Sequence, residues 1–274
     1  MKTWLITGAS SGLGLDMTAK LLARGDRVVA CGRRGAALEA LARTAGERLR
    51  IARFDVADTA ALRREVDAAF ATFGRIDVVV GKAGYGLFGA AEEVTDAQIE
   101  RQIATNLTAS IQLVRAVLPH LRAQGGGRIV QVSSEGGQAT YPGFGLYHAT
   151  KWGIEGFCDA VAQEVTPFGI DVVIVEPGPT ATGFAGALDR AAPMAAYDAT
   201  PAGEVRRAVS GGGFEIRGDA GRTVDAMIRV ADSARPRRRI ALGSIAFANI
   251  HRALNARLDD LLAQEALTLT ADRA

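Results

Sequence analysis

The stretch TWLITGASSGLG, residues 3–14, joins a strand-length run of apolar and β-branched residues to a turn with three glycines, Gly8, Gly12 and Gly14. The residues after it have the pattern of a helix that ends at Gly25. Glycines between a strand and a helix let the backbone approach a pyrophosphate, whose charge is favoured by the N–H groups at the helix start. The stretch predicts a strand, turn and helix that bind a dinucleotide, although any glycine-rich turn could also have this pattern.

Strand-length runs of the same kind recur along the chain, and helix-length segments separate them. The runs lie at 27–31, 50–55, 76–80, 128–134 and 171–178. Strands that are apolar almost throughout indicate a parallel sheet with both faces covered. The sequence therefore predicts an α/β fold, a Rossmann-like doubly wound parallel sheet with helices on both faces, in a single domain over residues 1–274.

The regular pattern fades after Gly178. The segment 179–218 is rich in Pro, Gly and Ala and predicts a mobile excursion from the sheet that serves as a substrate lid. A helix at 223–231, a strand at 240–242 and a C-terminal helix at about 245–265 are expected to follow. The apolar stripe of this last helix consists of Ile250, Leu254, Leu258, Leu261 and Leu262.

The composition is that of an ordinary globular protein. Of 274 residues, 48% are hydrophobic and 23% are charged, and the net charge is only +2, which gives no argument for nucleic acid binding. The basic run RPRRR at 235–239 is interpreted as a solvated segment before a strand. Without a signal-peptide pattern or about 18 uninterrupted apolar residues, a cytoplasmic protein with no membrane partner is expected.

The cysteines and histidines do not indicate a special site. Cys31 and Cys158 are far apart and are expected to be free thiols rather than a disulfide. The histidines lack the spacing of a metal site, so no metal is expected. They are His120, His148 and His251.

The stretch YHATK, residues 147–151, places Tyr147 and Lys151 four residues apart, on one face of a helix. The chain has only four Tyr and four Lys, so a chance pair of this spacing is uncommon. An ammonium close to a phenol stabilises the phenolate and is expected to lower the pKa of Tyr147. The pair predicts an acid–base group, against the alternative of two unrelated side chains on an exposed helix.

With the GxxxGxG spacing of the glycine turn and YHATK downstream, the chain resembles the short-chain dehydrogenase/reductase family over residues 3–185. The resemblance implies that Ser134, in QVSSEGG, donates to a substrate carbonyl, with Ser133 as the competitor. It implies that Lys151 also holds the nicotinamide ribose. It implies further that Asn106, in ATNLTAS, holds a water that leads protons to Lys151, unless Asn106 is only an exposed polar residue.

The expected cofactor is NADP(H). The second strand ends in VVACGRR, with Gly32 where NAD-using relatives carry an acid, followed by Arg33 and Arg34. An arginine here accommodates a 2′-phosphate, although both could be plain solvated charges. The resemblance places Asp55 at the adenine, unless it caps a turn, and Thr180 or Thr182 at the nicotinamide amide, unless 175–183 is only a proline turn. The expected cofactor contacts are Gly8, Ser10, Ser11, Gly12, Leu13, Gly14, Arg33, Arg34, Asp55, Val56, Ala83, Gly84, Tyr147, Lys151, Pro177, Gly178, Thr180 and Thr182.

One segment departs from the family pattern. The family usually has NNAG after its fourth strand, whereas this chain has GKAG, Gly81 to Gly84. We expect Lys82 either to contact the cofactor or nearby backbone carbonyls, or to extend its ammonium to water.

Aromatic residues on loops at the carboxyl ends of the strands predict a fairly hydrophobic pocket for a carbonyl or alcohol substrate, although they could equally pack the lid. They are Tyr85, Phe88, Tyr141, Phe144 and Phe184. Glu135, next to Ser134, is interpreted as a surface carboxylate.

The sequence thus predicts an NADP-dependent oxidoreductase of the carbonyl reductase or alcohol dehydrogenase type. The alternatives are an enzyme of the same fold with no net redox chemistry, such as an epimerase or dehydratase, and a non-catalytic sensor of NADP(H). The resemblance implies a homodimer or homotetramer, assembled through the helices that hold Asn106 and Tyr147.

Overall fold

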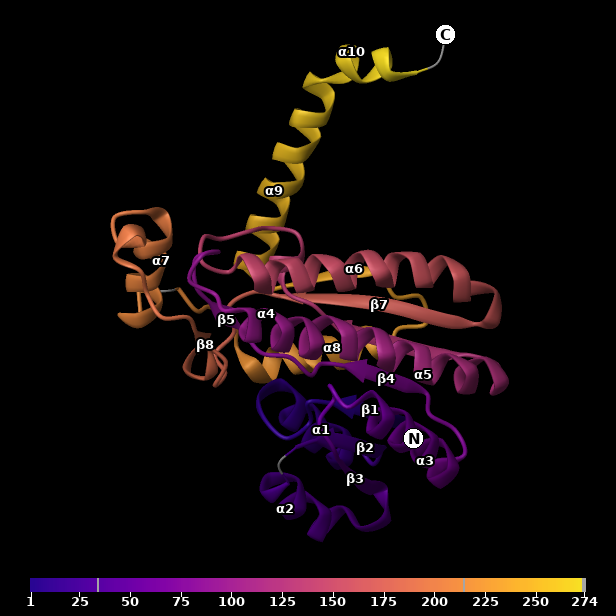
Figure 1. Ribbon diagram of the computed structural model, residues 1–274. Helices are drawn as coiled ribbons and strands as arrows, with labels where there is room; N and C mark the ends of the chain where they lie inside the picture. The colour runs from indigo at the N-terminus through magenta and orange to yellow at the C-terminus, as the bar shows by residue number, and fades with distance from the viewer. Residues whose placement is uncertain (34, 214, 273–274) are drawn as a thin grey trace.

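A computed structural model describes residues 1–33, 35–213 and 215–272. Its centre is a seven-stranded sheet in the order β3-β2-β1-β4-β6-β7-β9, in which every neighbouring pair is parallel (Figure 1). The predicted doubly wound fold in one domain is confirmed. The strands are β1 Thr3–Thr7, β2 Arg27–Gly32, β3 Leu49–Arg53, β4 Val78–Gly81, β6 Gly127–Val132, β7 Ile170–Pro177 and β9 Arg239–Leu242.

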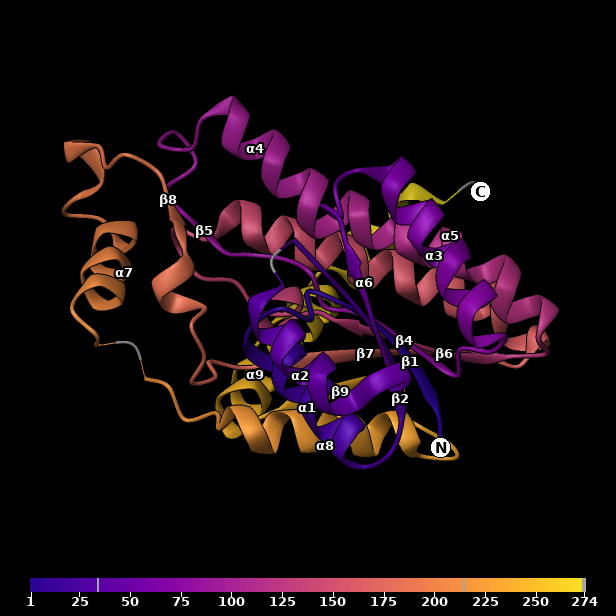
Figure 2. The same cartoon turned by 90° about the horizontal axis from the view of Figure 1, so that it is seen from below.

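Helices cover both faces of this sheet, because successive strand residues point to opposite sides. Leu5 packs in the core with α3, α5 and α6, whereas Trp4 and Ile6 pack in the core with α1, α2 and α8 (Figure 2). The helices are α1 Gly12–Ala23, α2 Ala36–Ala45, α3 Thr59–Phe73, α4 Asp96–Ile103, α5 Ala109–Ala123, α6 Gly145–Val165, α7 Pro201–Ser210, α8 Ala220–Asp232, α9 Ser244–Ala263 and α10 Glu265–Thr268. Among the described residues, no helix combines the length and apolar character needed to span a membrane.

The strand order fixes where a ligand can bind. The chain runs outward from β1 through β2 to β3, and then returns to β4 on the other side of β1. The connection after β1 therefore leads towards one edge of the sheet and the connection after β4 towards the other. In open α/β sheets, the crevice between two such loops, at the carboxyl ends of the strands, is where ligands bind. The glycine turn and GKAG are the two segments that border it.

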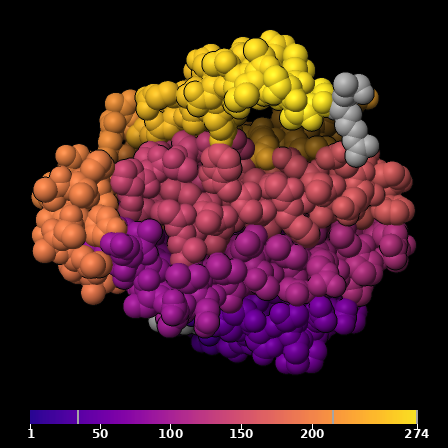
Figure 3. Space-filling view, turned by 45° about the horizontal axis from the view of Figure 1, so that its top comes forward, coloured from indigo at the N-terminus to yellow at the C-terminus, as the bar shows by residue number. Residues whose placement is uncertain are grey.

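The predicted excursion, 179–218, forms a lobe at one end of the molecule (Figure 3). It contains α7 and a two-residue strand β8, Asp189–Arg190, which pairs with β5, Leu87–Phe88, in the segment after β4. Arg206 of α7 forms an ion pair with the buried carboxylate of Glu93. Glu93 also accepts a hydrogen bond from the backbone N–H of Met194 at 2.8 Å. These contacts join the excursion to the segment after β4.

The C-terminal helix α9 has its predicted place in the chain, but its apolar stripe is not part of the core. Ile250 is buried, whereas the leucines beyond it are between 48% and 61% exposed, because α9 leaves the body as it extends (Figure 1). The exposed leucines are Leu254, Leu258, Leu261 and Leu262. Amphipathic periodicity predicts the helix correctly but does not show what covers its apolar face.

Candidate functional site

The glycine turn presents open backbone to the crevice. Ser11, the residue that precedes α1, makes no side-chain hydrogen bond to the helix start, and the first turn, GLGL, carries no acid. A Cβ on Gly14 would lie 2.3 Å from the carbonyl oxygen of Gly8, so only glycine permits this approach of helix to strand. Exposed N–H groups at the positive end of a helix suit a pyrophosphate. The residues present therefore fit the dinucleotide that the sequence predicts.

The end of β2 is closely packed at Gly32 and is followed by an exposed arginine. A Cβ on Gly32 would lie 3.0 Å from the Cβ and Oγ of Ser10, which leaves little room for a carboxylate side chain. Arg33 follows with its side chain 74% exposed and Nη1 3.8 Å from Oδ2 of Asp55. The second predicted arginine, Arg34, lies outside the described residues.

Asp55 and the GKAG segment border the predicted adenosine end. Asp55 Oδ1 accepts a hydrogen bond from the backbone N–H of Ala57 at 3.0 Å, so it does cap the next turn, while Oδ2 faces Arg33. The backbone N–H groups of Lys82 and Ala83 donate to Oγ1 of Thr7 at 3.1 and 3.3 Å. These bonds hold the loops after β1 and β4 together.

The tyrosine and lysine that the sequence predicts as a pair both lie in α6, where Lys151 is buried and Tyr147 is partly exposed. The ammonium of Lys151, whose residue is 7% exposed, donates to the carbonyl of Val132 at 3.1 Å and lies 5.7 Å from the ring centroid of Tyr147. The hydroxyl of Ser134 is within hydrogen-bonding reach of the Tyr147 phenol. The structure thus brings the serine, tyrosine and lysine into one group.

Burial changes the pKa of both members of the pair. The pKa of Lys151 is lowered to about 8, mainly by burial, with the charge of Glu155 opposing the change and that of Lys82 adding to it. Burial raises the pKa of the Tyr147 phenol to about 12, which the hydrogen bond with Ser134 opposes and Glu135 reinforces. The sequence predicts a lowered value for Tyr147, and this is wrong for the structure, because removal of phenolate from water outweighs the favourable contacts.

Ser133 and Ser134 have different partners, because Ser133 belongs to a buried network of charged side chains. Ser133 Oγ donates to Glu155 at 2.5 Å, which turns its hydroxyl away from Tyr147. Arg239 forms ion pairs with Glu155, Asp159 and Glu176. The prediction that the whole 235–239 run is solvated is wrong for Arg239, because three carboxylates of α6 and β7 surround its guanidinium.

Asn106 lies in a single turn of π-helix, Ala104–Thr108, between α4 and α5. Its side chain is buried, accepting from the backbone N–H of Tyr85 at 3.0 Å and donating to the carbonyl of Tyr85 at 2.8 Å. It also donates to Oγ1 of Thr150, in α6, at 3.5 Å. The alternative of an exposed polar residue is excluded. The amide instead fixes the chain after β4 against α6.

A second cluster braces the loop between Ser134 and α6. Nδ1 of His148 donates to the carbonyl of Gly136 at 2.9 Å, and Nε2 accepts from the backbone N–H of Tyr141 at 2.9 Å, a pattern that requires the neutral imidazole. Glu135 accepts from the Tyr141 hydroxyl at 2.6 Å and from Nδ2 of Asn249, in α9, at 3.2 Å. The interpretation of Glu135 as a surface carboxylate is wrong, because it is 3% exposed.

Only some of the predicted pocket aromatics lie beside Tyr147. The ring centroids of Phe144 and Phe184 lie 6.3 and 6.0 Å from that of Tyr147. Phe88 is buried and packs edge-on against Phe144 at 5.1 Å. Phe184 is 42% exposed and comes from the lobe, so its position depends on how that lobe is held.

The sequence analysis misses several supporting residues. Glu155 lies four residues after Lys151, as Lys151 does after Tyr147, so the helical spacing could have placed it on the same face. His148 adjoins Tyr147, but its hydrogen bonds to the loop have no signal in the sequence. The same is true of Asn249 and Arg239, which come from segments distant in the chain.

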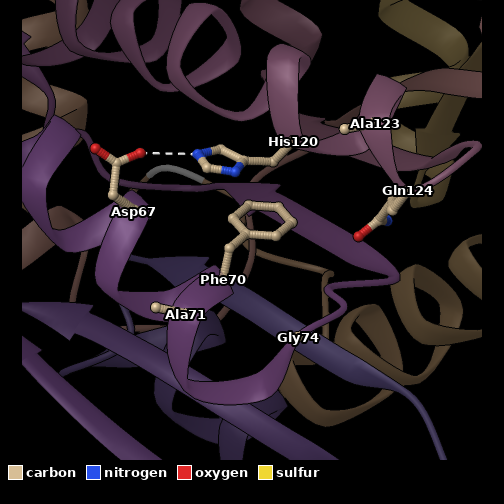
Figure 4. A pocket seen from close by; sticks show the side chains of 7 residues that line it. All are labelled: Asp67, Phe70, Ala71, Gly74, His120, Ala123 and Gln124. Atoms are coloured by element: carbon tan, nitrogen blue, oxygen red, sulfur yellow. Dashed lines mark hydrogen bonds and ion pairs between the residues drawn. The ribbon is translucent and has the colours of Figure 1, made fainter.

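A shallow hollow of about 510 Å³ lies elsewhere, between the C-terminal parts of α3 and α5 (Figure 4). There, His120 stacks on Phe70 with ring centroids 4.3 Å apart and pairs with Asp67 at 2.7 Å. These helix ends lead to the amino ends of β4 and β6. The hollow is therefore at the opposite edge of the sheet from Tyr147.

Comparisons with known proteins agree with this geometry. A family model described as short chain dehydrogenase matches residues 2–192. Oxidoreductase BOA17 of Botryotinia fuckeliana is 40% identical over 186 residues, 68% of each chain, and 3-ketodihydrosphingosine reductase of Bacteroides thetaiotaomicron is 37% identical over 183 residues, 66% of this chain and 64% of its own. A solved short-chain dehydrogenase from Streptomyces avermitilis has a TM-score of 0.92 at 33% identity, with 99% of each chain covered.

The neutral state of His148 generates a testable pH dependence. Burial lowers the pKa of His148 below its ordinary value of 6.5. Its contribution to stability is complete above that value, and is lost as the pH falls, because the unfolded chain takes up a proton before the folded one. We expect the free energy of unfolding to fall more between about pH 7 and 5 in the wild type than in His148→Gln. Urea unfolding at each pH measures this free energy. If it falls by the same amount with pH in the two proteins, the prediction is contradicted.

Proposed function

This chain belongs to the short-chain dehydrogenase family, and we propose that it transfers hydride between NADP(H) and a carbonyl or alcohol substrate. The observation that carries the proposal is the close grouping of Ser134 and Tyr147 with the buried Lys151, together with an open glycine turn. Membership in the family makes the protein an oxidoreductase that uses a nicotinamide dinucleotide. The choice of NADP(H), the substrate class and the residue roles are the parts that we propose.

The proposed chemistry divides among the three side chains. Bound NADPH would supply the hydride to the carbonyl carbon. Tyr147 donates its proton to the developing alkoxide, which is feasible because burial keeps the phenol protonated at neutral pH. Ser134 donates to the same oxygen and fixes its position. Lys151 supplies a positive charge next to the phenol, and oxidation of an alcohol follows the same path in reverse.

Asn106 and the network around Glu155 position this group. Asn106 holds the backbone of Tyr85 and touches Thr150, one residue before Lys151. Glu155 fixes Ser133, and with it the end of β6 that carries Ser134. We assign positioning roles to both residues and propose that the family's proton path to Lys151 passes beside Asn106.

Two observations support a hydrophobic ketone or alcohol. The rings of Phe144 and Phe184 lie beside Tyr147 and would exclude water from an apolar substrate. One relative bears the name of a reductase of 3-ketodihydrosphingosine, in which the group reduced is a ketone. The segment 179–218 is proposed as the lid, because it brings Phe184 to the site.

We also propose a homodimer or homotetramer in the cytoplasm, assembled through the helices α4, α5 and α6. Light scattering measures the mass directly. The exposed leucines of α9 offer another apolar surface to which such an assembly could extend.

The first prediction of this proposal concerns Tyr147→Phe. The variant keeps the ring and its packing but loses the proton donor, so we expect turnover of aliphatic and aromatic ketones with NADPH to fall by about 100- to 10,000-fold. NADPH affinity should remain close to that of the wild type. NADPH consumption over a panel of carbonyl compounds measures it, with Tyr197→Phe, whose hydroxyl donates to the exposed Glu92, as a matched control. Wild-type turnover that persists in Tyr147→Phe would contradict the assigned role, and epimerisation without NADPH consumption would favour the non-redox alternative.

A second prediction concerns the cofactor. Arg33→Ser should raise the Kd for NADPH by about tenfold or more and leave the Kd for NADH unchanged, because only NADPH carries the 2′-phosphate. Calorimetric titration measures both constants. Arg237→Ser, in an exposed arginine remote from the crevice, is the control. Equal affinity of the Arg33 variant and the wild type for NADPH would remove the argument for NADP(H).

A further inference from the structure

Lys82 occupies the position at which the chain departs from the family pattern, and its side chain lies against the glycine turn. Its ammonium donates to the carbonyl of Ser11, the residue before α1, over a long 3.4 Å. A Cβ on Gly12 would lie 4.0 Å from this ammonium. It would lie equally far, 4.0 Å, from Cβ of Thr182 in the loop after β7. The lysine thus reaches the place where the glycine turn, the start of α1 and the loop after β7 converge.

Within the described residues, the charge of Glu155 acts on Lys151, but no negative group acts on Lys82 in the same way. In the described ranges, neither Lys82 nor Lys151 forms an ion pair with a carboxylate. Burial lowers the pKa of Lys82, and the two lysines are close enough for Lys82 to lower the pKa of Lys151 as well. Two ammonium groups near one crevice, beside the positive end of α1, repel each other and favour an anion between them.

We propose that Lys82 binds the pyrophosphate of the dinucleotide and is a cationic contact that this chain has in place of the usual asparagine amide. The inference rests on the proposed dinucleotide-binding function. It adds a residue, Lys82, through which cofactor binding changes the protonation of Lys151. The pyrophosphate is the part of the cofactor that the glycine turn suits. When it enters, it offsets the repulsion between Lys82 and Lys151.

This coupling has a proton signature. The titratable groups that act on Lys151 are Glu155 and Lys82, and its ammonium lies near the ring of Tyr147. Around Lys82, the glycine turn and the loop after β7 offer backbone and hydroxyl groups. At a pH near 8, Lys151 is partly deprotonated in the free protein. An anion beside the two lysines favours their charged forms, so binding takes up protons. Removal of Lys82 raises the pKa of Lys151 in the free protein and so reduces the uptake.

The test uses Lys82→Met, which keeps the stem and removes the charge, and Lys82→Arg, which restores a charge. The expected result is a Kd about tenfold higher in Lys82→Met for NADPH and for ADP-ribose, which both carry the pyrophosphate. Adenosine 2′-monophosphate, which lacks it, should bind both proteins equally. Titration calorimetry in buffers of different ionisation enthalpy should show less proton uptake for Lys82→Met than for the wild type, and Lys82→Arg should recover most of the affinity. Lys20→Met, in a lysine paired with Asp225 on the surface, is the control.

The outcomes separate this inference from the proposed function. If the wild type and Lys82→Met bind NADPH and ADP-ribose with equal affinity and equal proton uptake, the inference is overturned while the proposed function stands. If the Kd values for all three ligands rise by the same factor in Lys82→Met, Lys82 maintains the shape of the site and does not bind the pyrophosphate, and the inference is again overturned. If the wild type binds no dinucleotide, the proposed function itself fails. Circular dichroism at each temperature used shows that the variants are folded.

Discussion

The site depends on the burial of one charge, the ammonium of Lys151. A charged amine loses hydration when it is buried, and here, within the described residues, it makes one hydrogen bond, which it donates to the carbonyl of Val132. The neighbouring Glu155 opposes the loss, but its carboxylate is shared with Ser133, Gln138 and Arg239. As a result, the pKa of Lys151 falls to about 8, where small changes in the surrounding charge decide whether it is protonated. The protonation of Lys151 is therefore sensitive to nearby charge.

The rest of the structure holds this group in place from several directions. The parallel sheet brings the loops after β1, β4, β6 and β7 to one edge. The π-helical turn at Asn106 and the loop contacts of His148 then fix the backbone on both sides of α6. Asn249 of α9 extends this bracing to the C-terminal helix through Glu135 and Tyr141.

The sequence predicts the sheet and the close grouping of Tyr147 with Lys151, because both follow from local patterns. Apolar runs identify the strands, and the glycine turn and the Tyr147–Lys151 spacing are each contained in a few residues. Features that depend on burial or on distant segments are not predictable in this way. In the sequence, Glu135 and Arg239 are indistinguishable from solvated charges, because only the fold shows what surrounds them. The pKa of Tyr147 is raised rather than lowered, because the spacing of residues along a helix does not show how far burial removes a side chain from water. The exposure of Leu258 could not be predicted either, because the periodicity of apolar residues does not show what covers that face of the helix.

The most direct test of the account is the titration of the lysine side chains by NMR, with ¹³C at the ε position. The chain has only four lysines, Lys2, Lys20, Lys82 and Lys151, so substitution of each assigns every signal. The account predicts that the signals of Lys82 and Lys151 titrate below the ordinary value of 10.5, that of Lys151 near 8, and that NADPH moves both upward. If every lysine signal titrates at or above 10.5 and none responds to NADPH, the buried charge at the centre of this account is contradicted.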